Sequence, residues 1–500
     1  MRKPTTALLL LTALTGLCFL LEGCGPQKKT WGSFRREWEA RGEKFDYRAM
    51  VPAPIPSEKN FAHTPLLEPL FDYEWNSELT DSKPADPEKH EQAEGLLDID
   101  EDLPAVIRWQ SGRRVELAAF QEIFRKEGFW PHPEKAGKPA EDILQALEVF
   151  ADDMAELTRA AKERPLCRFD IKYEAHFAAA MPHLLVLRNL TRCYTLRAVA
   201  RLHAGDLEAA FADVEMGLFL AECLADEPLA LSQLVRISNL EMILQAIWEG
   251  FAAGKWTARQ LTALEKRLAE IDLIESCRRA LRCERDMANQ FIDQVKADAG
   301  YKKTQDLVDL DKHWPSTDPA GWLDRNQLRF NERYMKFNRR IIDIEARLIK
   351  PGVAAEQLKY IEENKMKPDH VISSLIVLSI GPLVRQFGSG QAVVDHALIA
   401  CMLERHKLKK GKYPGKLAEL EGNLPTDPYS GKPYLYSVAP GTGPGERYQL
   451  YGVGWNQEDD GGKIALDNWG GTRESQGDLV WRYSPPPALL DIPKPGKKKN

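Results

Sequence analysis

Apolar residues recur at intervals of three and four along most of the chain after residue 102, which is the spacing of one face of an α-helix. The stretch 141–161 shows the pattern clearly, because Ile143, Leu147 and Met154 stand among acidic side chains. An apolar stripe flanked by charges is typical of a helix that packs on a core. The pattern therefore predicts a mainly helical protein with a helical stretch over 141–161, whose apolar stripe includes Val149.

Four helical stretches follow one another between His183 and Asp272. Residues that end helices stand between them, namely Gly205, Pro228 and Gly254. Short turns between helices make antiparallel neighbours. No 34-residue period repeats down the chain, so we expect an irregular helical bundle or a short solenoid of the tetratricopeptide type.

The stretch from Pro26 to about Asp102 lacks helical periodicity and carries Pro52, Pro54 and Pro56. Proline disrupts both helices and central strands, so this stretch should be extended. Aromatic residues in its first part indicate that it drapes over the folded body. The part from Leu79 onward is charged and is predicted to be a solvated linker.

The C-terminal part changes from helical to alternating patterns. A predicted helix over 392–410 precedes three alternating stretches, YLYSV, RYQLYGVGW and DLVWRY. Alternation of apolar and polar residues indicates strands, so we expect a small α+β module of one helix and a three-stranded antiparallel sheet. The predicted segments are 1–23 (signal peptide), 24–102 (extended segment and linker), 103–385 (helical body), 386–487 (α+β module) and 488–500 (basic disordered tail).

The first residues predict export. A short positive start precedes about fifteen mostly apolar residues, fewer than the roughly 20 that span a membrane. The sequence Leu21-Glu22-Gly23-Cys24 follows and resembles the bacterial lipobox, although Glu22 departs from the usual residue at its position. This resemblance implies lipidation of Cys24, with a non-lipidated signal peptide or an uncleaved anchor as alternatives. Gly25 is not Asp, which favours the outer membrane over the inner one if the organism sorts lipoproteins by that residue.

Composition narrows the class further. The chain has 500 residues, a formal net charge of -6 and a pI of about 6.0, so no broadly basic surface for nucleic acid is expected. Six cysteines follow Cys24 without a CxxC spacing. We interpret them mainly as small buried apolar residues, with Cys193 and Cys223 as the best candidates for a disulfide.

Four strings carry a resemblance to a known family. They are PSEKNFAHTPLLEPLF, RFDIKYEAHFAAAMPHLLVLRNLTRCYTLRA, ADEPLALSQLVRI and KLKKGKYPGKLAEL. In this order they resemble a family of uncharacterised envelope proteins of planctomycetes and verrucomicrobia. The resemblance implies a fold and an envelope location, and it implies no activity.

The C-terminal module is similar to the globular domain of the major pseudopilin of type II secretion. The shared features are a helix, the turn Gly411-Lys412-Tyr413-Pro414, the stretch Asp427-Pro428-Tyr429-Ser430-Gly431-Lys432-Pro433, an acidic glycine-containing loop and a final strand with Trp481. The chain has no prepilin cleavage signature, so assembly into a pilus is not implied.

The resembled pseudopilin loops bind calcium, and the residue spacing gives partial independent support. Asn456, Glu458, Asp460, Gly461 and Asp467 match positions 1, 3, 5, 6 and 12 of a calcium loop. The full set of candidate metal ligands is Asn456, Glu458, Asp459, Asp460, Asp467 and Asp478. The match departs from the usual calcium loop in three ways, namely Asn at position 1, Asp at position 12 and flanking strands. A plain acidic turn therefore remains the alternative.

Other candidate sites are weaker. No HxxH, HExxH, GxSxG or GxxxxGK[ST] motif occurs, and His132, His176, His183 and His396 are predicted to be structural. Glu174 beside His176 is a conceivable acid/base pair. Four arginines recur near helical spacing and form either a basic stripe for acidic partners or an ordinary solvated face. They are Arg188, Arg192, Arg197 and Arg201. The apolar run 371–384 contains Pro382 and predicts a buried helix.

Two functions remain open. The first is a non-catalytic lipoprotein on the periplasmic face of the cell envelope, which binds a protein partner as a scaffold. One version of this function links the scaffold to secretion or pilus-like machinery. The second is an envelope hydrolase whose site assembles from scattered residues. A cleft with converging carboxylates or histidines would favour the second function.

Overall fold

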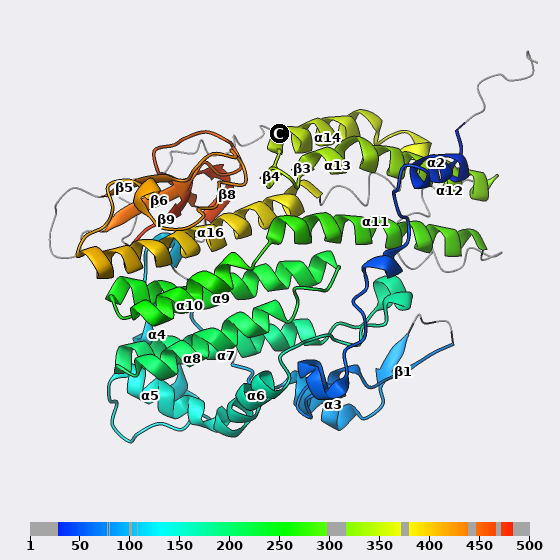
Figure 1. Ribbon diagram of the computed structural model, residues 1–500. Coiled ribbons are helices and arrows are strands. Elements are labelled where there is room, and N and C mark those ends of the chain that lie inside the picture. The colour runs from blue at the N-terminus through cyan, green and yellow to red at the C-terminus, as the bar shows by residue number, and fades with distance from the viewer. Residues whose placement is uncertain are drawn as a thin grey trace, which may run out of the picture.

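The computed structural model describes residues 29–77, 79, 81–99, 103–107, 109–297, 317–371, 380–438, 447–466 and 472–483. It is mainly helical, with small antiparallel sheets of two or three strands, so the predicted fold class is confirmed. Figure 1 shows the long helices stacked side by side, with the C-terminal sheets on the outer side of one of them.

The centre of the stack is the predicted run of four helices, which is confirmed. These are α7 (His183–Ala204), α8 (Leu207–Glu222), α9 (Ala230–Ala253) and α10 (Ala258–Ala269). Gly205 (φ 91°) and Gly254 (φ 62°) end α7 and α9 in the left-handed conformation, which glycine adopts without a Cβ clash. Thr257 and Gln260 form a capping box that starts α10.

Helices α11 (Leu273–Ala297) and α16 (Ile380–Lys410) pack on this centre. Helix α12 (Pro319–Arg333) packs on α11, α14 (Pro351–Asn364) packs on α16, and the short α13 (Arg339–Ile341) lies between α12 and α14 in the chain. The described part of helix α16 starts twelve residues before the predicted 392 and includes Pro382. Part of the apolar run 371–384 lies outside the described residues. In the described ranges, every helix is too short or too polar to cross a bilayer.

The stretch predicted to be helical over 141–161 is helical, but a 3-10 turn interrupts its apolar stripe. The structure divides it into α5 (Pro139–Ala146), a 3-10 turn (Leu147–Phe150) and α6 (Ala151–Glu163). A 3-10 turn has three residues per turn instead of 3.6, so it rotates the following residues relative to the stripe. Val149, expected in the apolar stripe, is 41% exposed as a result. Helix α4 (Leu117–Lys126) packs beside α5.

The N-terminal segment is more structured than predicted. It contains α2 (Trp31–Glu39), α3 (Pro87–Glu94) and a hairpin of β1 (Tyr73–Trp75) with β2 (Ser82–Pro84). Short 3-10 helices stand between α2 and β1, at Tyr47–Met50, Ser57–Lys59, Phe61–His63 and Glu68–Phe71. These elements are too short to show a periodic pattern.

The predicted solvated linker from Leu79 to Asp102 is wrong where it is described. Asp86 caps α3, Pro87 occupies its first position, and Leu97 and Ile99 are buried. The aromatic residues of the segment do pack on the body, as expected. Phe61 is fully buried against Phe219 of α8, and Phe71 lies 5.3 Å from His183 of α7 between ring centroids.

The C-terminal module has the predicted three-stranded antiparallel sheet. Its strands are β5 (Leu435–Val438), β6 (Tyr448–Gly452) and β9 (Leu479–Trp481), in the order β5-β6-β9. In the register of the sheet, Leu450 faces both Tyr436 and Trp481. The module also contains an unpredicted hairpin of β7 (Ile464–Leu466) and β8 (Thr472–Gly477), which forms a separate two-stranded sheet. A further short pair, β3 (Ile342–Asp343) and β4 (Leu348–Ile349), precedes α14.

One hydrophobic core runs through the N-terminal segment, the helical body and the C-terminal module. Trp481 of β9 is fully buried and lies against Trp109, near the start of the helical body, and Phe251 of α9. The indole Nε1 of Trp248 donates to the carbonyl of Arg482 at 2.8 Å. A smaller apolar cluster joins α11 to α12. The module is therefore packed into the body.

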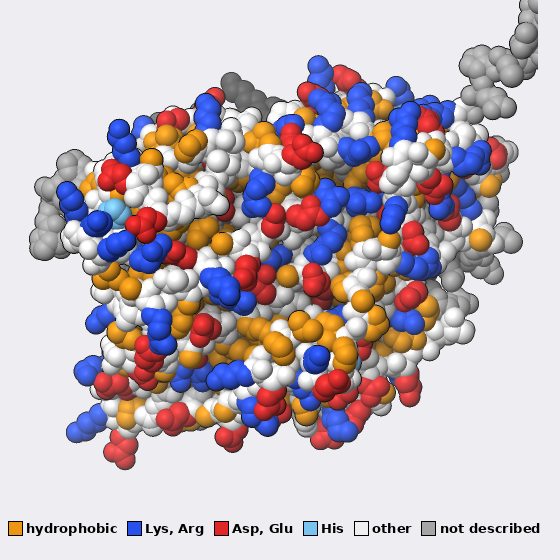
Figure 2. All heavy atoms as spheres, in the orientation of Figure 1, with side chains coloured by type: hydrophobic (Ala, Val, Ile, Leu, Met, Phe, Trp, Pro, Cys, Tyr) orange, Lys and Arg blue, Asp and Glu red, His pale blue; other side chains and the backbone are white. Residues whose placement is uncertain are grey.

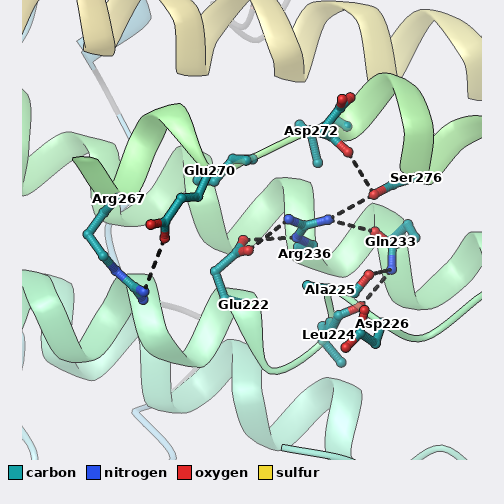
Figure 3. A network of polar contacts seen from close by, with 12 residues as sticks. Glu222, Leu224, Ala225, Asp226, Gln233, Arg236, Arg267, Glu270, Asp272 and Ser276 are labelled. Atoms are coloured by element: carbon teal, nitrogen blue, oxygen red, sulfur yellow. Dashed lines mark hydrogen bonds and ion pairs between the residues drawn. The ribbon is translucent and has the colours of Figure 1, made fainter. Parts of the chain in front are cut away.

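A buried arginine joins three helices of the stack (Figure 3). The guanidinium of Arg236 on α9 donates to the carboxylate of Glu222 on α8 at 2.9 and 3.0 Å. It also donates to Ser276 on α11 at 3.0 Å and to Gln233 at 3.2 Å. Arg236 is only 3% exposed, so these bonds satisfy a charge within the core.

Candidate functional site

Two predicted site residues lie outside the described residues. They are Cys24, the predicted lipidation residue, and Asp467, the twelfth position of the predicted calcium loop. The other candidate ligands are described, and they lie in the loop between β6 and β7 and at the start of β9.

Asp478 lies at the centre of the acidic loop. Its carboxylate accepts the backbone N–H groups of Gly462 at 2.6 Å and Asp460 at 3.3 Å. The pKa of Asp478 is raised to about 6, mainly by burial and also by the nearby carboxylates of Asp460 and Asp459. The two backbone hydrogen bonds act in the opposite direction. A cation near this carboxylate would favour its charged form.

The remaining candidate ligands mostly bond within the loop. The side-chain oxygens of Asn456 and Asp459 accept the N–H groups of Glu458 and Gly461, two residues ahead in each case. The amide of Asn456 donates to Asp460 at 3.0 Å. These are the contacts of an acidic turn.

The described loop does not by itself fit a calcium site. Within the described ranges, no three His, Cys, Asp or Glu residues are grouped as a metal site requires. The position expected to complete the coordination, Asp467, is outside those ranges, so calcium binding stays a prediction.

A small cavity lies beneath this loop, between the module and the helices. Its volume is about 30 Å³, and its lining includes Asp478, Ser389 and His396. His396 on α16 is 1% exposed, and its Nε2 has no hydrogen-bond partner among the described residues. Burial lowers the pKa of His396 to about 3. The cavity has room for one or two water molecules and is too small for an organic substrate.

The structure separates the conceivable pair Glu174 and His176. Glu174 is exposed and lies 4.0 Å from Lys172 in an ion pair, whereas His176 is buried with both ring nitrogens unpartnered among the described residues. The pair therefore does not form a hydrogen-bonded acid/base site.

The cysteine prediction changes as well. All six described cysteines are free, so the proposed disulfide between Cys193 and Cys223 is wrong for this structure. The thiol that contacts Cys223 is that of Cys167, whose pKa is raised mainly by burial and also by this neighbour. The interpretation of the cysteines as mostly buried is confirmed.

Most of the predicted arginine stripe on α7 is paired within the protein. Arg197 and Arg201 both donate to the buried carboxylate of Asp213 on α8, at 2.6 and 2.7 Å, and Arg192 donates to the carbonyl of Ile99. Arg188 is the exposed member. The stripe thus mainly holds neighbouring segments together. On the face in Figure 2, acidic and basic side chains are interspersed.

The structure contains a hydrogen-bonded chain of serine, histidine and aspartate that the sequence motifs did not predict. Ser57 Oγ lies 2.9 Å from His63 Nδ1, and His63 Nε2 lies 3.0 Å from Asp170 Oδ2. His63 and Asp170 also line a cleft of about 600 Å³. His63 and Asp170 are far apart in the sequence, and Ser57 stands in no nucleophile motif, so no spacing signal could have joined them.

The chain matches none of the protein-family models, curated proteins or solved structures with which we compared it. The two resemblances of the sequence therefore remain predictions.

Proposed function

We propose that this protein is an exported lipoprotein, anchored by Cys24 to an envelope membrane with its body on the periplasmic side, that acts as a scaffold for a protein partner. The observation that carries the proposal is the continuous core from the N-terminal segment to β9. A body without independently packed parts holds its surfaces in fixed positions, which is what a scaffold requires.

The start of the folded body supports the membrane position. Helix α2 begins at Trp31, whose N–H donates to Asp324 of α12, so the chain is attached to the body from there. Six residues lie between Cys24 and Trp31, so the two Cα atoms are at most about 25 Å apart when the chain is extended. A lipid on Cys24 would hold the body close to the headgroups.

The exposed edge of the C-terminal sheet supports a protein partner. Within the described residues, β5 pairs with β6 alone, and its Leu435 and Val438 are 36% and 41% exposed. An unpaired edge offers backbone donors and acceptors to an added strand, and exposed apolar side chains add contact area.

Cell fractionation tests the anchor. Cys24→Ser should move the protein from the membrane to the soluble envelope fraction. Cys167→Ser, which alters a cysteine of the folded body, should leave it in the membrane. Membrane retention of the Cys24→Ser protein would contradict the anchor.

Photo-crosslinking in intact cells tests the scaffold. A photoreactive amino acid at Leu435 should crosslink one defined protein, and the same residue at Met366, which is 87% exposed on the body, should not. Equal capture at both positions, or none at Leu435, would contradict a partner at β5.

A second function, that of an envelope hydrolase, is favoured by one observation. Ser57, His63 and Asp170 are arranged in the order nucleophile, base and orienting carboxylate, and His63 and Asp170 line a cleft.

A further inference from the structure

The second of the two proposed functions requires a reactive nucleophile, and the N-terminal segment carries one candidate. We infer that Ser57 is the nucleophile of an acyl-transfer site, with His63 as its base and Asp170 as the residue that positions His63. The substrate class is an ester or amide that carries a positive charge.

The hydrogen bonds fix the roles of the two ring nitrogens. Asp170 is a hydrogen-bond acceptor, so His63 Nε2 carries the proton that it donates. In that tautomer Nδ1 has the free lone pair, which faces the hydroxyl of Ser57 at 2.9 Å. This is the order of a serine–histidine–aspartate triad with the two ring nitrogens exchanged.

Contacts between distant segments hold the three residues in place. Buried Asn60 accepts the N–H of Arg168 at 2.9 Å and donates to its carbonyl at 2.8 Å. The N–H of Phe61 donates to the carbonyl of Leu166 at 2.7 Å. Segment 57–64 is therefore fixed against segment 166–170, which brings the serine and histidine to the aspartate.

Arg168 also fixes the orientation of the carboxylate. Its Nη1 donates to Asp170 Oδ1 at 2.6 Å, and its Nε donates to the carbonyl of Pro52 at 3.0 Å. Because Oδ1 is engaged by Arg168, Oδ2 remains for His63. Arg164 contacts the carbonyl of His63 from the other side.

The cleft determines the charge of the substrate. Its acidic lining residues are Glu68, Asp72, Asp86 and Asp170, against one lysine, Lys89. Clefts lined by one sign of charge concentrate ligands of the opposite sign. His63 is about one-fifth exposed and lines this cleft, and the exposed Ser57 contacts the ring of His63 without lining the cleft itself.

The reaction balances without a metal or a redox partner. Ser57 Oγ bonds to the carbonyl carbon while its proton passes to His63 Nδ1. The bond from this carbon to the leaving oxygen or nitrogen breaks, and the leaving group takes the proton from His63. Water then attacks the acyl-serine by the same route and releases the acid.

A fluorophosphonate tests the nucleophile in the full-length protein. Ser57 Oγ should bond to phosphorus and displace fluoride, and mass spectrometry should find the adduct on Ser57. Ser77, another exposed serine of the same segment, is the matched control and should carry none. Labelling should be at least ten times slower in His63→Gln. Absence of the adduct, or an unchanged rate in His63→Gln, would overturn the inference.

The positioning role of Asp170 needs a separate readout. Asp170→Asn should slow labelling of Ser57, and Asp170→Glu, which keeps the carboxylate, should restore part of the rate. Unchanged labelling in Asp170→Asn would exclude a role for the carboxylate.

Ester hydrolysis separates the failure of this site from the failure of the hydrolase function. A nitrophenyl ester with an ammonium group should be cleaved at least ten times faster than one with a carboxylate, and Ser57→Ala should abolish the activity. Cleavage that survives in Ser57→Ala would place the hydrolase elsewhere, and equal rates with both esters would exclude the cationic substrate.

Discussion

Trp109 and Trp481 lie against each other across the junction between the helical body and the C-terminal module, with ring centroids 5.2 Å apart and an angle of 39° between the ring planes. Trp109 also donates its indole N–H to the carbonyl of Glu241 on α9, and both indoles are almost completely buried. The contact links the start of the helical body to the C-terminal end of the described chain.

Loss of this contact should destabilise the whole protein. Trp481→Ala removes a fully buried indole, and such truncations cost about 3–5 kcal/mol of unfolding free energy. Because the core is continuous, helical circular dichroism and tryptophan fluorescence should report one shared transition in guanidinium, at a lower midpoint. Phe129→Ala, at a 67% exposed side chain, should change the free energy by less than about 0.5 kcal/mol. Two separate transitions in the wild type would contradict the continuous core.

Arg236 should contribute to stability through the helices that it joins (Figure 3). Removing one partner of a buried ion pair leaves the other charge without compensation, so Arg236→Ala should cost about 3 kcal/mol, the lower end for buried pairs. The lower end applies because the side chain of Glu222 keeps 25% exposure. Urea unfolding measures the loss.

An exposed ion pair provides the comparison for Arg236. Arg259 and Glu208 are 79% and 68% exposed, and Arg259→Ala should cost less than about 1 kcal/mol. Equal losses in the two variants would show that burial does not govern the contribution of Arg236.

Asp395 should make stability decrease with rising pH. Burial raises its pKa to about 7, although Gln391 and Tyr434 donate hydrogen bonds that lower it. An unfolded aspartate titrates near about 3.9, so between these values the folded state binds the proton more tightly. The contribution is complete below about pH 4 and is lost as the pH rises to about 7. The free energy of unfolding of Asp395→Asn, relative to wild type, should therefore increase from pH 4 to pH 7.

His396, the next residue, should act in the opposite direction. Burial lowers its pKa to about 3, so its contribution is present above the unfolded histidine value of about 6.5 and is lost as the pH falls. Relative to wild type, His396→Gln should lose stability as the pH rises over this range. If the free energies of unfolding of the two variants, relative to wild type, changed with pH in the same direction, the pKa shift of Asp395 or that of His396 would be contradicted.

Calcium should stabilise the full-length protein if the acidic loop and Asp467 form a site. A calcium concentration of about 100 times the dissociation constant should raise the free energy of unfolding by about 2.7 kcal/mol. Thermal unfolding with calcium or with chelator measures it, and Asp460→Ala should abolish the difference. Glu163→Ala, at an exposed acidic residue at the end of α6, should keep it. Identical wild-type curves in both conditions would leave the acidic turn as the explanation of the loop.

The sequence by itself determined the elements whose signals are local. Helices α7 to α10 follow from the residues that end helices, Gly205, Pro228 and Gly254, and strands β5, β6 and β9 follow from alternation. These signals are carried by neighbours in the chain, so they can be read without knowing the fold. Short elements such as α2 and α3 were not predicted, because a few residues do not establish a periodic pattern.

The tertiary structure alone decided which distant residues meet. Arg197 and Arg201 became internal ion pairs because Asp213 lies on the adjacent helix, and Trp481 became part of the body because Trp109 packs on it. The chain of Ser57, His63 and Asp170 depends on the docking of segment 57–64 on segment 166–170. Such contacts follow from how helices and loops pack, and no local pattern of residue types encodes that packing.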